Sequence, residues 1–400
     1  MSQNYEAILR YRAYFATFGI KVQAANKLLK SNGNRDNILF ANLLQAVVMI
    51  DAELIPKIKM VAPGTLLRQA LDEILMARFG ALIVFLDDIK QQEKILEGGF
   101  YIGASFSPEK VYELAKMDGA IILDENVSRI LAANVQLTPD TSLPTNETGM
   151  RHRAAERMAR QTGKFVLSIS RRRSVITLYY RRFKHQLNDI GYLISRIGQT
   201  IYTVEHYKEN LDKLVSRLDA DELENRVLLA QVIELVSRCL NILSLLDEIN
   251  PYVVETGIEG RLSAMRLNAA NEEIDALLTL LAEDYCADMR SEQETRRIVE
   301  TLRAGVPPDD QKISDALGWR MPDGIDLYDI AAQPRGLRIL KQIAKIPAAA
   351  ARNVVNRFKY LSVLIQADTA ALMEVEGVGE KRARSIIEAI QHLQSRHTHL

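Results

Sequence analysis

The stretch GMRHRAAERMARQTGKFVLSIS, residues 149–170, decides the fold of the region around it. A glycine precedes a helical pattern at 151–161, and an apolar run at 165–170 then has the length and composition of a buried strand. A helix that leads into a strand is a building unit of α/β layers. The stretch therefore predicts an α/β domain.

Further helical and strand-like runs flank this stretch. Thr65 is a candidate N-cap for a helix whose apolar positions predict a buried face. That face comprises Leu66, Leu67, Ala70, Leu71, Ile74 and Leu75. More elements are expected as strands at 81–86, 120–123, 130–137 and 175–180 and as a helix at 108–117. Their order predicts a mixed sheet within an α/β domain at 56–183.

The rest of the chain is expected to be helical. After residue 183 the apolar period becomes that of helices, which predicts a helical spine at 184–306. Prolines at 307 and 308 open a linker, 307–334, and short helices follow at 335–400. The first 55 residues have the pattern of two or three amphipathic helices. They are either a partner-binding module or the product of an extended gene start.

Composition indicates a folded, soluble, cytoplasmic protein. Of 400 residues, 48% are hydrophobic and 26% are charged. The longest apolar run, 38–50, is interrupted by Asn42 and Gln45 and is shorter than the ~20 residues that span a bilayer. The N-terminus has no secretory pattern. We therefore expect no membrane association. Cys239 and Cys286 lie in helical patterns without metal-ligand spacing and are expected in the core.

Charge is concentrated in two regions. The formal net charge is zero, which argues against a chain that is basic throughout and binds nucleic acid indiscriminately. However, residues 150–185 contain eleven Lys and Arg and one acid, Glu156. Residues 335–400 contain eleven Lys and Arg and five acids. Two separate anion-binding regions are the expected result.

Two clusters in the α/β domain carry chemistry. DGA, residues 118–120, lies at a helix-to-strand junction, and GMRHRA, residues 149–154, lies at a loop-to-helix junction. Gly119 and Gly149 would let the backbone approach a ligand or adopt a positive φ. Free N–H groups at the helix start, with two guanidinium groups and an imidazole, predict a clamp for a triphosphate. Asp118 would hold a divalent cation on the phosphates or accept the proton of an attacking ribose hydroxyl.

Simpler interpretations exist for each cluster. Asp-Gly is a common turn, and Arg-His-Arg on a helix is more often a solvated surface. A third basic group, residues 171–173, lies at the expected tip of a hairpin, where it could also be merely solvated. The combination of the clusters favours a functional site.

The order DGA, then GxRHR, then AERxAxQTG resembles the signature of diadenylate cyclase domains. Here it reads MDGA at 117–120 and GMRHRAAERMARQTG at 149–163, and the similarity continues to Tyr180. GGF at 98–100 and ANV at 133–135 also resemble the family. The spine and tail resemble one branch of it, the DNA-integrity-scanning proteins.

This resemblance implies a homo-octamer that condenses two ATP into cyclic di-AMP, with Mg²⁺ or Mn²⁺ as cofactor. Each site would form between two facing domains. Asp118 would be the metal ligand and activate the hydroxyl, and it would be catalytic together with Arg151, His152 and Arg153. The ATP contacts implied are Gly119, Ala120, Leu137, Met150, Arg151, His152, Arg153, Ala154, Ser170, Arg171 and Arg173. The resemblance also implies that branched DNA regulates the enzyme, that it acts in the response to DNA damage, and that it associates with the nucleoid.

The sequence departs from the family pattern at two positions. Met150 and Ala154 stand where Thr is common in the branch. If the Thr at the first position contributes mainly backbone contacts, Met150 is tolerated, and if its hydroxyl bonds the nucleotide, affinity or rate should fall. We expect the first.

The tail contains a helix-hairpin-helix pattern. LMEVEGVGEKRA, residues 372–383, combines an apolar helix end, a Gly-x-Gly hairpin and a basic helix start. Its backbone N–H groups would meet a DNA phosphate without reading base sequence. The expected DNA contacts are Gly377, Gly379, Lys381, Arg382 and Arg384. IAKIPAAAA, residues 343–351, resembles a degenerate partner hairpin. The simpler alternative for 372–383 is a plain helical turn.

Two other functions are alternatives to the enzyme. A DNA-binding scaffold with an inactive nucleotide domain is disfavoured by the retained charged residues of the signature. A helix-hairpin-helix repair nuclease would need clustered acids for two metals, and only Asp118 has a convincing setting.

Overall fold

The structure is a computed structural model that describes residues 53–304, 309–319, 326–342 and 346–397. Its contacts divide the chain into two compact units. Among the described residues, the first unit contains those up to 197 together with 250–263, and the second contains 198–249 together with those from 264 onward. The predicted helices of residues 1–52 and the break at 307–308 lie outside the described residues.

A mixed eight-stranded sheet forms the centre of the first unit, as predicted. Its order is β2-β5-β4-β1-β6-β7-β8, and β3 pairs with β5 beside this path. Strands β1 and β4 are parallel, whereas the other pairs are antiparallel. The strands are β1 (Ala81–Phe85), β2 (Leu96–Glu97), β3 (Phe100–Ser105), β4 (Ala120–Leu123), β5 (Arg129–Leu137), β6 (Phe165–Ser170), β7 (Val175–Tyr180) and β8 (Phe183–Gln186).

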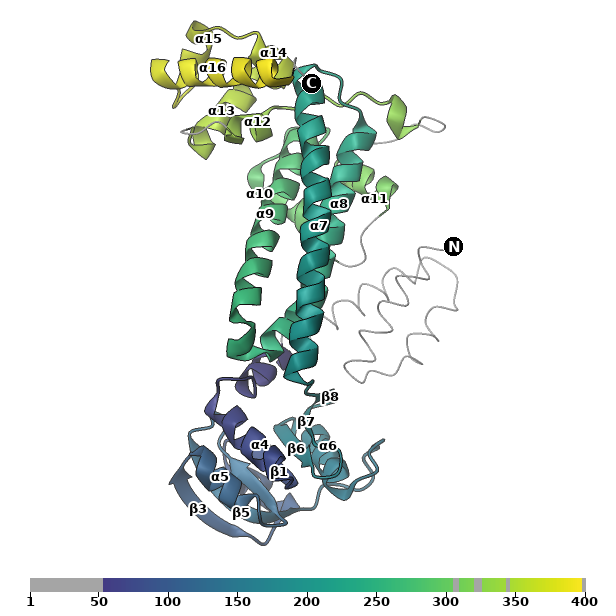
Figure 1. The fold of residues 1–400 in the computed structure, drawn as a ribbon, viewed down its shortest axis with the longest axis vertical. Helices are drawn as coiled ribbons and strands as arrows, with labels where there is room; N and C mark the ends of the chain where they lie inside the picture. The colour runs from purple at the N-terminus through teal and green to yellow at the C-terminus, as the bar shows by residue number, and fades with distance from the viewer. Residues whose placement is uncertain (1–52, 305–308, 320–325, 343–345, 398–400) are drawn as a thin grey trace. The chain divides into compact units, whose positions relative to one another are not determined.

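Helices cover both faces of this sheet (Figure 1). Strand β1 shows why: Ala81, Ile83 and Phe85 join one hydrophobic core, while Leu82 and Val84 join another. Helices α4 (Leu66–Met76) and α5 (Pro108–Leu114) complete the first core, and α6 (Met150–Thr162) completes the second. A sheet buried on both faces gives continuous apolar strands, which is why the sequence showed them clearly.

Some predictions for this unit need correction. Thr65 is the N-cap of α4, as predicted, and its hydroxyl accepts from the Arg68 N–H at 3.1 Å. Leu66, however, is exposed, because the first residue of α4 points away from the sheet. The strands β2, β3 and β8 were not predicted. Strands β2 and β8 are short and contain charged residues, and β3 is largely exposed, so none of the three has the apolar signal of a central strand.

The segment 250–263 returns to the first unit. The Ile258 N–H donates to the Pro63 carbonyl at 3.1 Å, and His185 on β8 contacts the Glu255 carboxylate at 3.0 Å. Because β8 pairs with β7, the sheet extends past residue 183, the predicted end of the domain, to Gln186.

Long helices dominate the second unit, as predicted for the spine (Figure 1). The three longest are α7 (Ile190–Leu223), α8 (Leu229–Glu255) and α9 (Arg261–Tyr285), and the shorter α10 (Glu292–Arg303) and α11 (Asp310–Ala316) follow. Helix α10 begins with a capping box between Ser291 and Glu294. By length and hydropathy α8 could cross a membrane, but 61% of its most apolar window is buried inside the protein, as in a core helix. Cys239 on α8 and Cys286 after α9 are buried, as predicted.

The tail folds into short helices around its own core, as predicted. Leu340, Val354, Leu364, Val375 and Ile386 are among its buried residues. The helices are α12 (Leu337–Gln342), α13 (Ala348–Phe358), α14 (Leu361–Ile365), α15 (Thr369–Met373) and α16 (Glu380–His397). The degenerate hairpin predicted at 343–351 lies partly outside the described residues.

Candidate functional site

Asp118 and Arg151 lie together although they are far apart in sequence. Arg151 Nη2 donates to Asp118 Oδ1 at 2.9 Å. The Asp118 side chain is fully exposed, and that of Arg151 is 37% exposed. An ion pair this open to solvent contributes only about 0–1 kcal/mol to folding. Both charges therefore remain available to a ligand.

Glycines make room for this pair. A Cβ on Gly80, just before β1, would lie 2.4 Å from Arg151 Nη1. A Cβ on Gly119 would lie 2.3 Å from the carbonyl carbon of Asn134, which has a φ of +55° on β5. Asn134 Oδ1 also accepts from the Gly119 N–H at 3.2 Å. Gly119 is thus required by close packing on β5 rather than by a positive φ. Gly80 and Asn134 were not predicted as site residues; their signals were a glycine next to a strand and the family-like ANV.

The N-terminus of α6 is open to solvent. Gly149 is its N-cap, with an ordinary φ of −83° and no side-chain cap, so a positive φ is not its role. Met150 at the first helical position is 80% exposed, and Arg153 is exposed as well. The first N–H groups of the helix, with the charges of Arg151 and Arg153, form a site suited to an anion.

His152 faces inward instead. Its Nδ1 lies 2.9 Å from the Tyr179 hydroxyl, which donates to Glu147 Oε1 at 2.9 Å. Lys184 pairs with the same carboxylate oxygen. Burial lowers the pKa of His152, and Lys184 and Arg173 lower it further, against the opposing effect of Glu147. Its imidazole is therefore neutral at pH 7 without a ligand.

The hairpin between β6 and β7 brings further cations. Residues 171–174 form its turn, and all four are exposed. Arg173 lies close enough to affect the pKa of both His152 and Tyr179. The predicted phosphate contacts Arg171 and Arg173 are thus on the same unit as the α6 N-terminus, and Ser170 Oγ accepts from the Arg173 N–H at 3.3 Å.

The remaining predicted ATP contacts differ in exposure. Ala120 is buried in the core, so only its backbone could meet a ligand. Leu137, at the end of β5, and Ala154, on α6, are half-buried.

The loop before α6 is held by side chains of the signature itself. Glu156 accepts from Thr145 Oγ1 at 2.5 Å and pairs with Arg160 at 2.6 Å. Arg157 Nε donates to the Leu143 carbonyl at 3.0 Å, and Gln161 accepts from the Asp140 N–H at 2.8 Å. These residues fix the path of 140–145 and so support the start of α6.

A divalent cation fits only together with a substrate. Among the described residues, no three His, Cys, Asp or Glu side chains gather as a metal site. Asp118 offers one carboxylate oxygen beside the oxygen bonded to Arg151. This is a fit for Mg²⁺, which is commonly held by one or two carboxylates plus phosphates and water. Asp118 would hold such an ion against bound phosphates, where the ion would offset their charge.

In the tail, the hairpin between α15 and α16 matches the prediction in shape. Gly377 has a φ of +84°, and a Cβ on Gly379 would meet open space. Arg382 Nη1 donates to the Gly377 carbonyl at 2.6 Å, and Arg384 pairs with Glu380 one turn earlier. Lys381 is exposed and forms no ion pair with the described part of the chain. Lys381 is therefore the cation most available to a phosphate.

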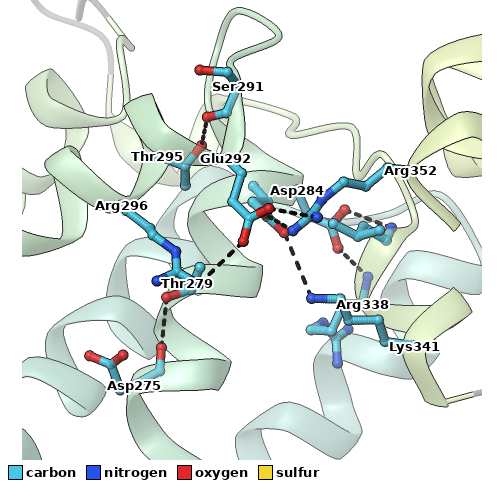
Figure 2. Close-up of polar contacts among 12 residues, drawn as sticks. Asp275, Thr279, Asp284, Ser291, Glu292, Thr295, Arg296, Arg338, Lys341 and Arg352 are labelled. Carbon is cyan, nitrogen blue, oxygen red and sulfur yellow. Dashed lines mark hydrogen bonds and ion pairs between the residues drawn. The ribbon is translucent and has the colours of Figure 1, made fainter. Parts of the chain in front are cut away.

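A buried charge cluster anchors the tail to α7 and α9 within the second unit. The carboxylate of Asp284 accepts from the backbone N–H groups of Leu337 and Arg338, each at 2.8 Å. The Arg338 side chain pairs with Asp219 and, at 2.8 Å, with Glu222. Arg352 of α13 pairs with Glu292 of α10 at 2.7 Å (Figure 2). These contacts fix α12 and α13 on the spine.

The chain thus combines a mixed-sheet domain with an anion site, a helical region and a helix-hairpin-helix tail. Three family models match it: the nucleotide-binding part of the DisA bacterial checkpoint controller at 68–183, its linker region at 187–323, and a SAM-like helix-hairpin-helix tandem at 337–392. The chain belongs to the family of DNA integrity scanning proteins, DisA.

Curated relatives support the same family. The DNA integrity scanning protein DisA of Thermotoga petrophila is 47% identical over 350 residues, covering 88% of this chain and 99% of the relative. That of Clostridium kluyveri is 40% identical over 344 residues, covering 86% and 96%. The DacA structure from Staphylococcus aureus is 23% identical over 35% of this chain and 90% of its own, with a TM-score of 0.26, too low to support an argument.

Proposed function

We propose that this protein is a diadenylate cyclase that condenses two ATP into cyclic di-AMP and two pyrophosphates. The observation that carries the proposal is the exposed Asp118–Arg151 pair beside the open N-terminus of α6. A triphosphate needs cationic and N–H donors, and an attacking hydroxyl needs a carboxylate nearby. Membership of the DisA family supports the same activity.

In this proposal the protein contributes mainly position and charge. Arg151, Arg153 and the N–H groups of α6 would bind phosphate oxygens, with Arg171 and Arg173 from the hairpin. Asp118 would hold Mg²⁺ or Mn²⁺ and accept the proton of the ribose 3′-hydroxyl. The hydroxyl oxygen then bonds to the α-phosphorus of the second ATP, and the bond to pyrophosphate breaks. Such transfers depend on alignment more than on covalent catalysis.

Two subunits would build one reaction site. A single domain presents one Asp118 and one α6 N-terminus, whereas the reaction needs two nucleotides that attack each other. Two domains face to face would supply both halves, and a homo-octamer would contain several such pairs.

The tail would regulate synthesis by binding DNA. Its hairpin offers backbone N–H groups and Lys381, which suit phosphates and ignore base sequence. Branched DNA is the expected ligand, with the protein located in the cytoplasm at the nucleoid and acting in the response to DNA damage.

The first experiment incubates the purified protein with ATP and Mg²⁺ or Mn²⁺, with and without a four-way DNA junction. Chromatography of the products should show cyclic di-AMP whose amount responds to the junction. Intact ATP under both metals, with the junction still bound, would instead favour the inactive scaffold.

A tail variant separates the two activities. Lys381→Glu with Arg382→Glu should weaken junction binding by about tenfold to a hundredfold and flatten its salt dependence, because phosphate contacts are lost. Synthesis without DNA should persist. Lys381→Glu alone is the matched control for the Arg382–Gly377 hydrogen bond, which supports the hairpin itself. Loss of both DNA binding and synthesis in a folded double variant would contradict the assignment of the two activities to separate parts of the chain.

A further inference from the structure

A chain of hydrogen bonds leads from His152 into the protein interior. It joins four elements: His152 on α6, Tyr179 on β7, Glu147 in the loop before α6, and Lys184 on β8. The Tyr179 ring is fully buried, and its hydroxyl contacts both His152 Nδ1 and Glu147 Oε1 at 2.9 Å. The fold does not require these hydrogen bonds, since a Phe in place of Tyr179 would fill the same apolar volume.

The direction of each hydrogen bond follows from counting protons. Burial would raise the pKa of Glu147, but Lys184 and Tyr179 outweigh it and lower the pKa, so the carboxylate is ionised and can only accept. Burial and Glu147 raise the pKa of Tyr179, so its hydroxyl keeps its one proton. That proton is donated to Glu147. The Tyr179 oxygen must therefore accept from His152, and Nδ1 must carry a hydrogen.

We propose that Tyr179 and Glu147 are positioning residues that hold His152 as the Nδ1–H tautomer and leave Nε2 to face the nucleotide. The inference rests on the proposed function for its substrate, though not for its geometry. It divides the labour in the Arg-His-Arg run. The two arginines can only donate, to phosphate oxygens, whereas the neutral His152 can only accept at Nε2, from a hydroxyl such as that of a ribose.

The surroundings of the ring agree with this assignment. The charged groups that act on His152 are Glu147, Lys184 and Arg173, from the loop, β8 and the hairpin. Two of these three are cations, which oppose a second proton on the ring. In water a free imidazole favours the other tautomer, so the Tyr179 hydroxyl is needed to reverse the preference.

Nitrogen-15 NMR of histidine-labelled protein without ATP tests the tautomer directly. His152→Asn assigns the signal among the six histidines of the chain. Above the titration of the ring, the wild type should show a protonated Nδ1 and a bare Nε2. Tyr179→Phe should convert the ring largely to the Nε2–H form. A wild type that is already Nε2–H, or a Tyr179→Phe ring unchanged from wild type, would overturn the inference.

Kinetics give the second reading. In Tyr179→Phe, kcat for cyclic di-AMP should fall about tenfold to a hundredfold, as is typical when the partner that orients a histidine is lost, with KM within about twofold. Glu147→Gln keeps an acceptor oxygen for Tyr179 and should retain the tautomer and most of kcat, whereas Glu147→Leu should not. Tyr180→Phe is the matched control, because Tyr180 lies next in β7 outside this chain of contacts. An equal loss in Tyr179→Phe and Tyr180→Phe would contradict a positioning role.

The two proposals fail in different ways. The NMR experiment measures the tautomer without substrate. An Nε2–H ring in an active enzyme would therefore contradict only the inference about Tyr179 and Glu147. If the wild type has an Nδ1–H ring but makes no cyclic di-AMP, the proposed cyclase activity is wrong. The kinetic role of Tyr179 and Glu147 is then wrong as well, whereas the assignment of the tautomer remains valid.

Discussion

Arg151 and Arg338 show two uses of a guanidinium group in one chain. Arg151 lies in the first turn of α6, where the N-cap Gly149 supplies no side-chain cap, and it pairs with the fully exposed Asp118. Arg338 is 3% exposed and contacts both Asp219 and Glu222. Removing a partner from an exposed pair costs about 0–1 kcal/mol, but from a buried pair about 3–5 kcal/mol. The Asp118–Arg151 pair therefore remains open to a ligand, whereas Arg338 and its two partners stabilise the fold.

Asp118→Asn gives the largest expected effect and tests the first half of this comparison. Synthesis of cyclic di-AMP should fall at least about ten-thousandfold, because an amide neither accepts the hydroxyl proton nor neutralises a cation. Thermal unfolding should remain within about 1 kcal/mol of wild type, since the pair is exposed. Junction binding serves as the control and should be unchanged. Substantial residual synthesis would assign the chemistry to another residue.

Arg338→Met tests the second half. It leaves Asp219 and Glu222 without their buried cation, so the free energy of unfolding should fall by about 3–5 kcal/mol. Chemical denaturation measures this directly. Arg357→Met is the matched control: Arg357 pairs with Glu374 in an exposed ion pair at 3.2 Å, and its loss should cost less than about 1 kcal/mol. Similar losses in both variants would erase the distinction between buried and exposed pairs.

Glu222 makes the stability of the tail anchor depend on pH. Burial raises its pKa to about 7 from an ordinary value of 4.5, although Arg338 opposes the shift. The folded state therefore holds the proton more tightly than the unfolded chain. The resulting stabilisation is complete below pH 4.5 and is lost as pH rises through 7, on the order of 3 kcal/mol in total.

Glu222→Gln removes this titration while it keeps an acceptor for the Tyr285 hydroxyl, which donates to Glu222 Oε1 at 2.5 Å. The free energy of unfolding of wild type minus that of the variant should decrease between pH 4.5 and 7. Taking the difference largely cancels groups that titrate in both proteins, including Asp284, whose pKa burial also raises. A difference that is flat across this range would show that Glu222 is ionised throughout.

The sequence predicted those elements whose residues carry a local signal, such as a continuous apolar run or a helix cap. The strands at 120–123, 165–170 and 175–180 agree with the structure residue for residue, because both faces are buried and the runs are continuously apolar. The edge strand β3 alternates exposed and half-buried residues and was missed. The helix N-cap at Thr65 carried a local signal, whereas the exposure of Leu66 depends on where the sheet lies.

The charged residues of the candidate site were predicted from the sequence, but the residues that pack against them were not. Asp118 and Arg151 were assigned because residue types and family signature agree, and the structure brings them within 2.9 Å. Gly80 and Tyr179 were missed: the space beside Gly80 is filled by an arginine that is distant in sequence, and an apolar strand pattern does not reveal the contacts of a tyrosine hydroxyl. Such supports arise only from tertiary contacts. The anchor residue Arg338 was likewise indistinguishable from a surface cation in a basic tail.

Met150→Thr has the smallest expected effect and refines the exposed side of the comparison. Met150 is 80% exposed at the first position of α6, where its free N–H group is the contribution any residue other than proline would make. Restoring the family's Thr should therefore change kcat and KM for ATP by less than about threefold, or about 0.7 kcal/mol. Met150→Pro is the matched variant: proline suits the first helical turn but removes that N–H. If the backbone donor binds nucleotide, Met150→Pro should raise KM several-fold while Met150→Thr does not. A large gain of activity in Met150→Thr would instead show that the Thr hydroxyl contacts the nucleotide and that the wild-type enzyme lacks this hydrogen bond.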